Sequence, residues 1–308
     1  MKAIAMGVHV LDVLVRPVEA IPEGQGGQLV EEIRMTAAGS AGGAALVLAR
    51  LGADVRSAGA VGTDPVGDML LRLLERDGVD TSLLVRREGV QTSASVLPIR
   101  PDGSRPAFHV VGANGAYGPD DAPWDAIAEA DVLHLGGPEF MGGEAAARVL
   151  SFAREHGVTT SADVLAPGEM GLLEWIAPAL PHVDYFLPND EQAAGFTGRD
   201  DVELACRALV ERGAGCVAAT CGADGVLLVD RDGSERVPAF AIDVVDTTGC
   251  GDAFSAGFLR GVGLGRSRRE AAELGCAAAA LVAQGLGTDA GEYDLETVES
   301  FAAATATR

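Results

Sequence analysis

The sequence predicts an α/β protein with a doubly wound, mostly parallel sheet, helices on both faces, and a small β-sheet lid. Short apolar runs alternate with helical stretches from about residue 40 onward. Two segments rich in β-branched residues interrupt this alternation, and a glycine-rich run precedes an apolar helix in the C-terminal third. Strands separated by helices favour a parallel sheet. In such sheets ligands bind at the C-terminal ends of the strands.

The alternating elements follow one another in a regular order. Apolar residues at helical spacing predict a helix over 44–51, which ends at Gly52. A strand is expected over 55–61 and a helix over 68–76. Further strands are expected over 132–135, 159–162, 185–187 and 216–220, with helices over 144–156 and 201–212.

The two interrupting segments are residues 13–36 and 90–112. They have the composition of β-hairpins, with turns expected at Glu23-Gly24 and Asp102-Gly103. We expect them to pair into one lid sheet over the main site, although they could also be unrelated surface excursions. The main α/β domain then comprises residues 1–12, 37–89 and 113–308.

Composition limits the partners and the compartment. The chain of 308 residues carries a formal net charge of −22, which argues against nucleic acids and anionic membranes as partners. The start of the chain has no apolar run long enough for a signal peptide. Five cysteines without Cys-x-x-Cys spacing are expected to be reduced thiols. We therefore expect a cytoplasmic protein.

The glycine-rich run reads Asp-Thr-Thr-Gly-Cys-Gly-Asp over residues 246–252. Val244 and Val245 precede it, so we expect the glycines where a strand turns into a helix N-terminus, a site suited to anionic oxygens. Asp252 at the mouth of that site could accept a proton from a hydroxyl that attacks a phosphoryl group; alternatively, it is an ordinary helix cap. The chain's single lysine, Lys2, excludes a Walker loop, and Phe254 stands where a dinucleotide fingerprint needs glycine.

Four motifs in order resemble the ribokinase-like (PfkB) family of carbohydrate and nucleoside kinases. They are the run over 246–252, the segment 38–68, the start over 7–12, which looks like a first strand, and Thr-Cys-Gly-Ala-Asp-Gly over 220–225. The resemblance implies an ATP- and Mg²⁺-dependent kinase that phosphorylates a hydroxyl of a small sugar or sugar derivative. A nucleoside kinase is the first alternative, and a non-catalytic ligand sensor is the second.

The resemblance also implies roles for individual residues. Asp252 would be the catalytic base, and the amides of Gly249, Cys250 and Gly251 would form the anion hole. The substrate would be bound by Asp12, Gly39, Gly42, Gly43 and Asn114, with Arg105 near the lid. ATP would be bound by Asn189, Thr220, Gly222, Gly225 and Cys276.

Metal sites and assembly follow from the same resemblance. Asn189, Glu191 and Gln192 would arrange Mg²⁺ through water; alternatively, Asn189 only caps the following helix. A monovalent cation, expected to be K⁺, would be held by Asp246, Thr248, Val282, Gly285, Gly287 and Gly291. The lid would pair between subunits, which predicts a homodimer.

Some positions depart from ribokinase itself. Gly43 stands where the family's substrate loop has Asn. A glutamate that contacts the sugar in ribokinase aligns near Gly136 of this chain. Gln192 replaces a glutamate of the magnesium element. From the lost polar groups we expect a roomier and less polar pocket, for which ribose is a poor first guess.

Overall fold

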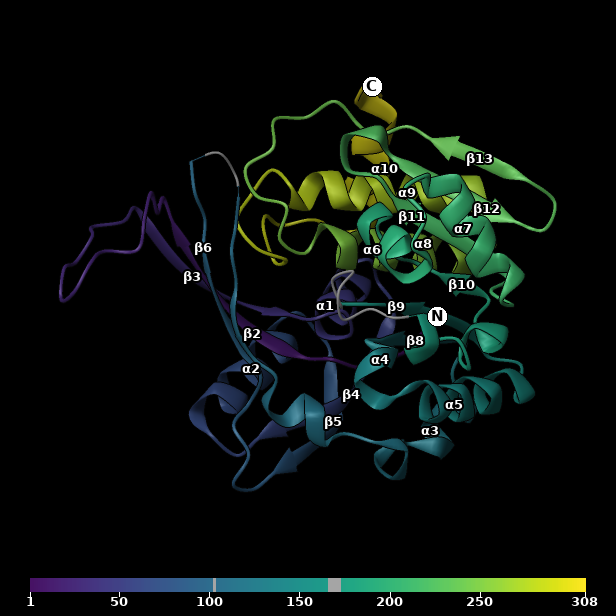
Figure 1. Cartoon of the computed structure of the whole chain (residues 1–308), viewed down its shortest axis with the longest axis horizontal. Coiled ribbons are helices and arrows are strands. Elements are labelled where there is room, and N and C mark those ends of the chain that lie inside the picture. Colours follow the sequence, from purple (N-terminus) through teal and green to yellow (C-terminus); the bar gives the residue numbers. More distant parts are fainter. Residues whose placement is uncertain (102–103, 166–172) are drawn as a thin grey trace.

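The computed structural model describes residues 1–101, 104–165 and 173–308, and contains two sheets (Figure 1). The main sheet has nine strands in the order β13-β12-β11-β10-β9-β8-β1-β4-β5. The smaller sheet has four strands in the order β3-β2-β6-β7. The turn expected at Asp102-Gly103 lies outside the described residues.

The main sheet is parallel except at one edge. Its parallel strands are β1 (Lys2–Gly7), β4 (Asp54–Gly62), β5 (Asp80–Arg87), β8 (Val132–Gly136), β9 (Thr159–Asp163), β10 (Tyr185–Phe186) and β11 (Cys216–Thr220). The antiparallel edge strands are β12 (Val226–Asp230) and β13 (Ser234–Val237). All the strands predicted within residues 55–220 of this sheet are present.

Helices cover both faces of the main sheet, as the alternating burial of β1 requires: Ala3 and Ala5 belong to one core cluster, Ile4 and Met6 to the other. The first face carries α1 (Gly42–Arg50), α2 (Pro65–Arg76), α8 (Cys250–Gly263), α9 (Arg268–Val282) and α10 (Leu295–Ala304). The second carries α3 (Trp124–Ala128), α5 (Gly143–Glu155), α6 (Asp190–Thr197) and α7 (Val202–Glu211). The doubly wound fold is confirmed.

Short connecting helices complete the chain. The helix α4 (Pro138–Met141) follows β8. Short 3₁₀ turns lie at Gly112–Ala116, Pro119–Asp121, Leu173–Trp175, Leu180–His182 and Gly222–Asp224. Within the described residues, no helix is both long and apolar enough to cross a membrane.

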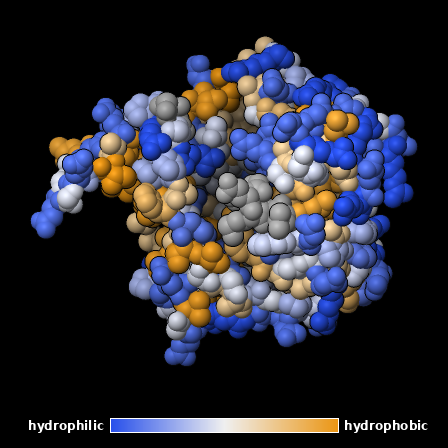
Figure 2. Space-filling model, in the orientation of Figure 1, coloured by the Kyte–Doolittle hydropathy of each residue, from blue (hydrophilic) through white to orange (hydrophobic). Residues whose placement is uncertain are grey.

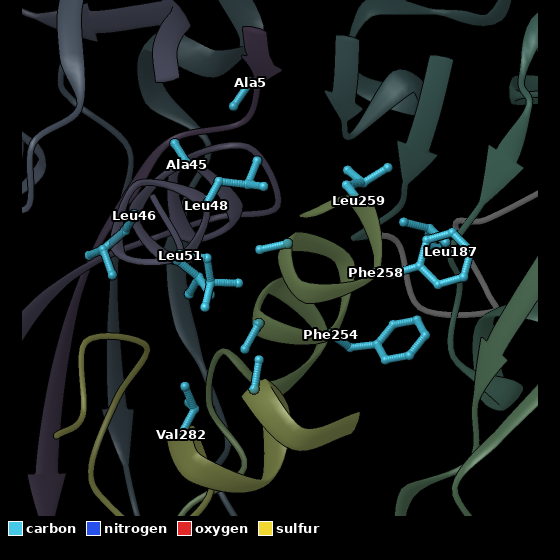
Figure 3. Packing of buried hydrophobic residues seen from close by; sticks show 14 of the residues in the cluster. Ala5, Ala45, Leu46, Leu48, Leu51, Leu187, Phe254, Phe258, Leu259 and Val282 are labelled. Carbon is cyan, nitrogen blue, oxygen red and sulfur yellow. The ribbon is translucent and has the colours of Figure 1, made fainter. Parts of the chain in front are cut away.

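Helices α1 and α8 pack together in the middle of the first face (Figure 3). Leu48 of α1 and Phe254 and Phe258 of α8 are all fully buried in one core cluster. Helix α8 also lies very close to α9, because a Cβ at Gly257 would be 2.8 Å from the Cα of Gly275. This packing fixes the N-terminus of α8, where the glycine-rich run over 246–252 lies.

The lid sheet joins the two segments that interrupt the alternation, as predicted. It consists of β2 (Val10–Arg16), β3 (Glu32–Ala38), β6 (Ala94–Pro98) and β7 (Phe108–Val110) and projects from the main domain (Figure 1). The turn at Glu23-Gly24 is present, with the Gly26 N–H bonded to the Glu23 carbonyl at 3.0 Å. The lid begins at Val10 and its second strand runs to Ala38, so Asp12 is a lid residue.

Two expected strands are wrong. The strand expected over 7–12 is divided, because β1 ends at Gly7 (φ 120°) and the chain then leaves the main sheet for the lid. A Cβ at Gly7 would lie 2.0 Å from the carbonyl oxygen of Gly136, so only glycine fits. Val244 and Val245 form no strand either: Val244 is 56% exposed, and the Val245 N–H bonds to the carbonyl of Ala283 instead of a sheet neighbour.

Candidate active site

The glycine-rich run forms the N-terminus of α8. Gly249 is the N-cap residue with φ 78°, and a Cβ there would lie 2.3 Å from Thr288 Oγ1. The first i→i−4 hydrogen bond of this end runs from Ala253 N–H to the Gly249 carbonyl. The amides before it point out of the helix end, although the Cys250 N–H is also within 3.3 Å of the Thr247 carbonyl. A helix end of this kind attracts anions.

Asp252 lies in the first turn of α8 and faces residues 39–43, which are predicted to bind the substrate and are called the substrate loop below. A Cβ at Gly43 would be 2.1 Å from Asp252 Oδ2, so the carboxylate lies directly against the Gly43 backbone. Burial raises the pKa of Asp252 well above its ordinary value, and the negative charges of Asp163 and Asp12 raise it further. The guanidinium of Arg105 acts in the opposite direction. A carboxyl group with a raised pKa is suited to accept a proton.

Asp163 is a residue of this site that the sequence analysis missed. It is the last residue of β9 and is 6% exposed. It accepts hydrogen bonds from the Val164 N–H (2.7 Å) and the Ser255 hydroxyl (3.4 Å) of α8. Burial, with the nearby charge of Glu139, raises its pKa to about 7. An aspartate that directly follows a buried strand run was a usable signal, because ligands bind at strand C-termini.

The lid contributes a row of polar side chains around Asp12. Thr36 and Ser95 lie directly opposite Asp12 on the two neighbouring strands, and His109 lies opposite Ser95. Directly paired residues share one face of a sheet. The Ser95 hydroxyl lies 3.0 Å from His109 Nδ1. Burial raises the pKa of Asp12 to about 6, against the opposing effects of Ser95 and Arg105.

The substrate loop is held from below by buried polar contacts. His134 Nε2 lies 3.1 Å from the Ser40 carbonyl, and its Nδ1 lies 2.9 Å from Ser161 Oγ. Because a carbonyl only accepts, Nε2 carries the proton and Nδ1 accepts from the serine. Burial lowers the pKa of His134 to about 4, so the ring is neutral. Gly39 in this loop has φ 88°, a conformation suited to glycine.

Asn114 and Gly42 lie at the same loop through His9. The Asn114 side chain accepts from the His9 N–H at 3.1 Å and donates to the His9 carbonyl at 3.0 Å. A Cβ at Gly42 would be 3.2 Å from the His9 ring. Asn114 therefore holds the segment that links β1 to the lid, which differs from its predicted role as a substrate ligand.

The expectation of a roomier pocket is wrong. The space beside Gly43 is filled by the carboxylate of Asp252, as described above. A Cβ at Gly136 would lie 2.4 Å from the Ala41 backbone nitrogen, so the neighbouring chain fills that space. Missing side chains at these positions allow the backbone and Asp252 to approach and do not enlarge the site.

A cavity of about 250 Å³ lies beside the anion loop, and its lining joins the predicted nucleotide residues to that loop. Four predicted residues line it: Thr220, Gly222, Gly225 and Cys276. Cys250 and Gly251 of the anion loop line it as well. Most of the remaining lining is apolar, which suits a nucleobase.

The magnesium element is a helix cap in this structure. Asn189 Oδ1 accepts from the Gln192 N–H, and Gln192 Oε1 accepts from the Asn189 N–H, a capping box at the start of α6. Gln192 Nε2 donates to the carbonyl of Val164, the residue after Asp163. The backbone of Asn189 pairs with that of Thr220 in an isolated parallel β-bridge. Glu191 is exposed. Among the described residues, no group of three or more His, Cys, Asp or Glu could hold a metal ion.

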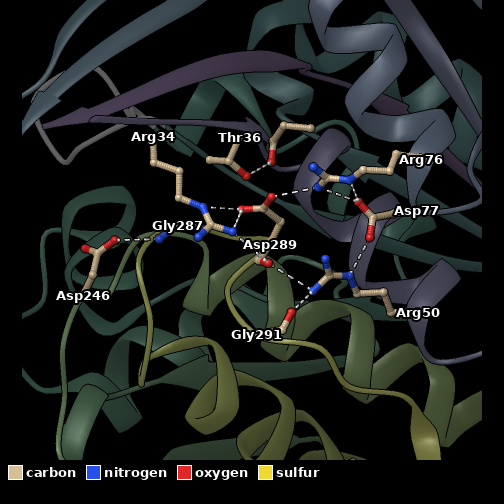
Figure 4. Close-up of polar contacts among 10 residues, drawn as sticks. Arg34, Thr36, Arg50, Arg76, Asp77, Asp246, Gly287, Asp289 and Gly291 are labelled. Carbon is tan, nitrogen blue, oxygen red and sulfur yellow. Dashed lines mark hydrogen bonds and ion pairs between the residues drawn. The ribbon is translucent and has the colours of Figure 1, made fainter. Parts of the chain in front are cut away.

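Several oxygen atoms of the predicted cation-binding loop already accept hydrogen bonds from the chain. Asp246 Oδ1 accepts from the Thr248 N–H and hydroxyl, and Oδ2 accepts from the Gly287 N–H, so Asp246 ties the loop to the anion run (Figure 4). The Gly291 carbonyl accepts from Arg50 Nη1 at 3.0 Å. This bond does not exclude Gly291 as a ligand, because the carbonyls of Val282 and Gly287 also each accept a hydrogen bond, from the N–H groups of Gly285 and Ala290. Cation binding by Asp246, Thr248, Val282, Gly285, Gly287 and Gly291 stays a prediction.

The comparisons with known proteins identify the family. The family model for pfkB family carbohydrate kinases matches residues 7–294, and the chain belongs to this family. An ATP-dependent ribose-1-phosphate kinase from Halopiger xanaduensis is 34% identical over 249 residues, covering 80% of each chain. A deoxyribokinase from Salmonella typhi is 27% identical, covering 68% of this chain and 69% of its own. A putative ribokinase structure from Agrobacterium tumefaciens has a TM-score of 0.86 at 26% identity, covering 98% and 97%.

The chain is thus an ATP-dependent phosphotransferase that acts on an alcohol group of a carbohydrate. The predicted class of enzyme and its fold are confirmed. The individual roles of the site residues remain predictions.

Proposed function

We propose that this kinase transfers the γ-phosphate of ATP to a hydroxyl of a small sugar or sugar derivative, with Asp252 as the general base. One observation carries the proposal: Asp252 stands in the first turn of α8 against Gly43, and the two residues before it, Cys250 and Gly251, line the proposed nucleotide cavity. Asp12 approaches the same place from the lid, since its charge acts on Asp252.

Each part of the site has a defined task in this mechanism. Asp12 and the loop over 39–43 bind and orient the sugar, and Asp252 accepts the proton of the attacking hydroxyl. The amides of Gly249, Cys250 and Gly251 donate to the phosphoryl oxygens, where charge develops. Bound Mg²⁺ would neutralise the phosphate oxygens, with Asn189, Glu191 and Gln192 holding it through water.

The names of the relatives support a sugar substrate over the alternatives. The ribose-1-phosphate kinase and the deoxyribokinase are named for pentose substrates. A nucleoside kinase from Methanothermobacter thermautotrophicus is 26% identical over 97% of this chain, so a nucleoside substrate is the second candidate. A non-catalytic sensor is the third; it is disfavoured because the base and the anion loop are both present.

The decisive experiment measures ADP release from Mg-ATP with a panel of sugars, sugar phosphates, sugar acids and nucleosides. One strong substrate would establish the substrate class. Nucleoside-dependent ADP release alone would favour the second candidate. Binding of ATP without ADP release on any member of the panel would favour the sensor.

We also propose K⁺ as an activating ion at Asp246 and Thr248, with the carbonyls of Val282, Gly285, Gly287 and Gly291. The oxygen-rich loop beside the anion run supports this site, because hard cations prefer oxygen ligands. Equal rates in sodium and potassium buffers would contradict it.

A homodimer through the lid is a further part of this proposal. Val13 pairs with Met35 and Val96, and Val96 pairs with Phe108, so these apolar side chains form one row on the lid face opposite Asp12. Met35, Val96 and Phe108 are 47%, 44% and 60% exposed, and apolar residues gather on the lid in Figure 2. An exposed apolar face of this kind fits a second lid. Light scattering at the mass of a monomer would contradict the dimer.

A further inference from the structure

The proposed site carries more negative charge than its side chains neutralise. Asp12 and Asp163 lie near enough to Asp252 for their negative charges to act on it, and ATP would bring further phosphate charge. The single lysine, Lys2, starts β1, where its backbone N–H bonds to Asp131. Arg105 is the one cation that acts on both Asp252 and Asp12 among the residues described.

Arg105 reaches the anion run from the lid. It lies in the connection between β6 and β7, and its guanidinium crosses to Thr247, the residue after Asp246. Arg105 Nε donates to Thr247 Oγ1 at 3.2 Å and Nη2 donates to the Thr247 carbonyl at 3.4 Å, while Nε lies 4.0 Å from Asp246 Oδ1. Thr247 also lines the nucleotide cavity. The guanidinium therefore lies where the lid, the cavity and the base meet.

The present contacts of Arg105 are ones that a phosphoryl group would replace. Thr247 offers two neutral oxygens at long distances, and the carboxylate of Asp246 already accepts from Thr248 and Gly287. The Arg105 side chain keeps 36% of its surface exposed. A guanidinium binds charged phosphate oxygens more strongly than neutral oxygens, and it can do so with two N–H groups.

We propose that Arg105 is a catalytic residue that the lid places on the transferring γ-phosphoryl group. This role rests on the proposed kinase function. The hydroxyl oxygen of the substrate gives its proton to Asp252 and forms a bond to the γ-phosphorus. The bond from that phosphorus to the bridging oxygen breaks, and its electron pair stays on ADP. Arg105 donates hydrogen bonds to the phosphoryl oxygens and exchanges no proton.

The test compares Arg105→Gln, Arg105→Lys and Arg105→Ala with the control Arg100→Gln. Arg100 lies in the same lid connection and bonds Ser104 Oγ at 3.2 Å. We expect Arg105→Gln to lower kcat by about 100-fold or more, with the KM for the sugar nearly unchanged, because the interaction forms with the transition state. Arg105→Lys should keep part of the rate, and added guanidine should restore part of the rate of Arg105→Ala. Arg100→Gln should stay within about twofold of the wild type.

Four outcomes would overturn the role of Arg105. An unchanged kcat with a raised KM for both substrates would make Arg105 a simple latch of the lid. An equal loss in Arg100→Gln, without rescue by guanidine, would make the effect one of lid folding. Wild-type protein without substrate-dependent ADP release would contradict the proposed function, and this role with it. Wild-type turnover that Arg105→Gln leaves intact would contradict this role alone.

Discussion

The molecule contains two clusters of charged side chains. In one of them the negative and positive charges are paired within the chain, and in the other the negative charges outnumber the positive ones. In the first, Asp289 accepts from Arg34 of the lid and Arg76 of α2, and its carbonyl accepts from Arg50 of α1 (Figure 4). In the second, the negative charges of Asp163 and Asp12 act on Asp252 in the candidate active site, and Arg105 opposes the negative charges of Asp252 and Asp12 there. The first cluster is satisfied within the chain and joins four segments. The second is complete only when a proton, a substrate or a cation is added, which is the arrangement expected of a functional site.

A large effect on the site is expected from Gly43→Ala. The added methyl group would lie 2.1 Å from Asp252 Oδ2, so the carboxylate must turn away from the substrate loop. We expect kcat to fall by about 100-fold, because a displaced base loses its alignment with the hydroxyl. Steady-state kinetics with the best substrate measures this. Gly118→Ala, where a Cβ meets no atom within 4 Å, is the control; equal rates for the two variants would contradict the account.

The balanced cluster is tested by Asp289→Ala. Removing a carboxylate that is 3% exposed leaves Arg34 without its ion-pair partner and leaves Arg76 paired with Asp77 alone. We expect a loss of about 2–3 kcal/mol in the free energy of unfolding, below the value for a fully buried pair because both arginines are partly exposed. Urea denaturation measures it. Glu235→Ala, which removes an exposed ion pair with Arg269, should cost less than about 0.5 kcal/mol. Similar losses in both would contradict the distinction.

The unbalanced cluster is tested by Asp163→Asn. Removing its negative charge lowers the pKa of Asp252, so the acid limb of the kcat/KM profile should move to lower pH. Arg105→Gln removes a positive charge and should move the same limb to higher pH. Shifts in the same direction, or none, would show that these groups do not set the protonation of the base.

Asp163→Asn should also change how stability depends on pH. His9 and His134 have pKa values of about 4 in the folded protein, below their ordinary value. Because of these two residues, the free energy of unfolding decreases as the pH falls from about 6.5 to 4. The Asp163 pKa of about 7 has the opposite effect. The carboxyl group takes up its proton at a higher pH in the folded protein than in the unfolded chain, so the free energy of unfolding increases as the pH falls below 7. Without this gain, the variant should lose about 1 kcal/mol per pH unit more than the wild type between pH 7 and 4. Parallel stability curves would contradict this assignment.

Much of the fold could be predicted, because strands and helices carry local patterns. The helix at 250–263 and the glycine-rich run over 246–252 are encoded by residues that are neighbours in the chain, so the sequence indicates both. Arg105, Asp163 and the filled space at Gly43 depend on segments far apart in the chain. The sequence shows that a side chain is missing at Gly43, but it does not show that Asp252 occupies that space. Such contacts need the three-dimensional packing.

The most direct test of the central claim is ADP release by the wild type and by Asp252→Asn with the best substrate of the panel. Asparagine keeps the size of the side chain but cannot accept the proton as a carboxylate does. The account predicts that kcat falls by about 1000-fold while ATP still binds and the protein stays folded. A variant that keeps most of the wild-type rate would contradict Asp252 as the base.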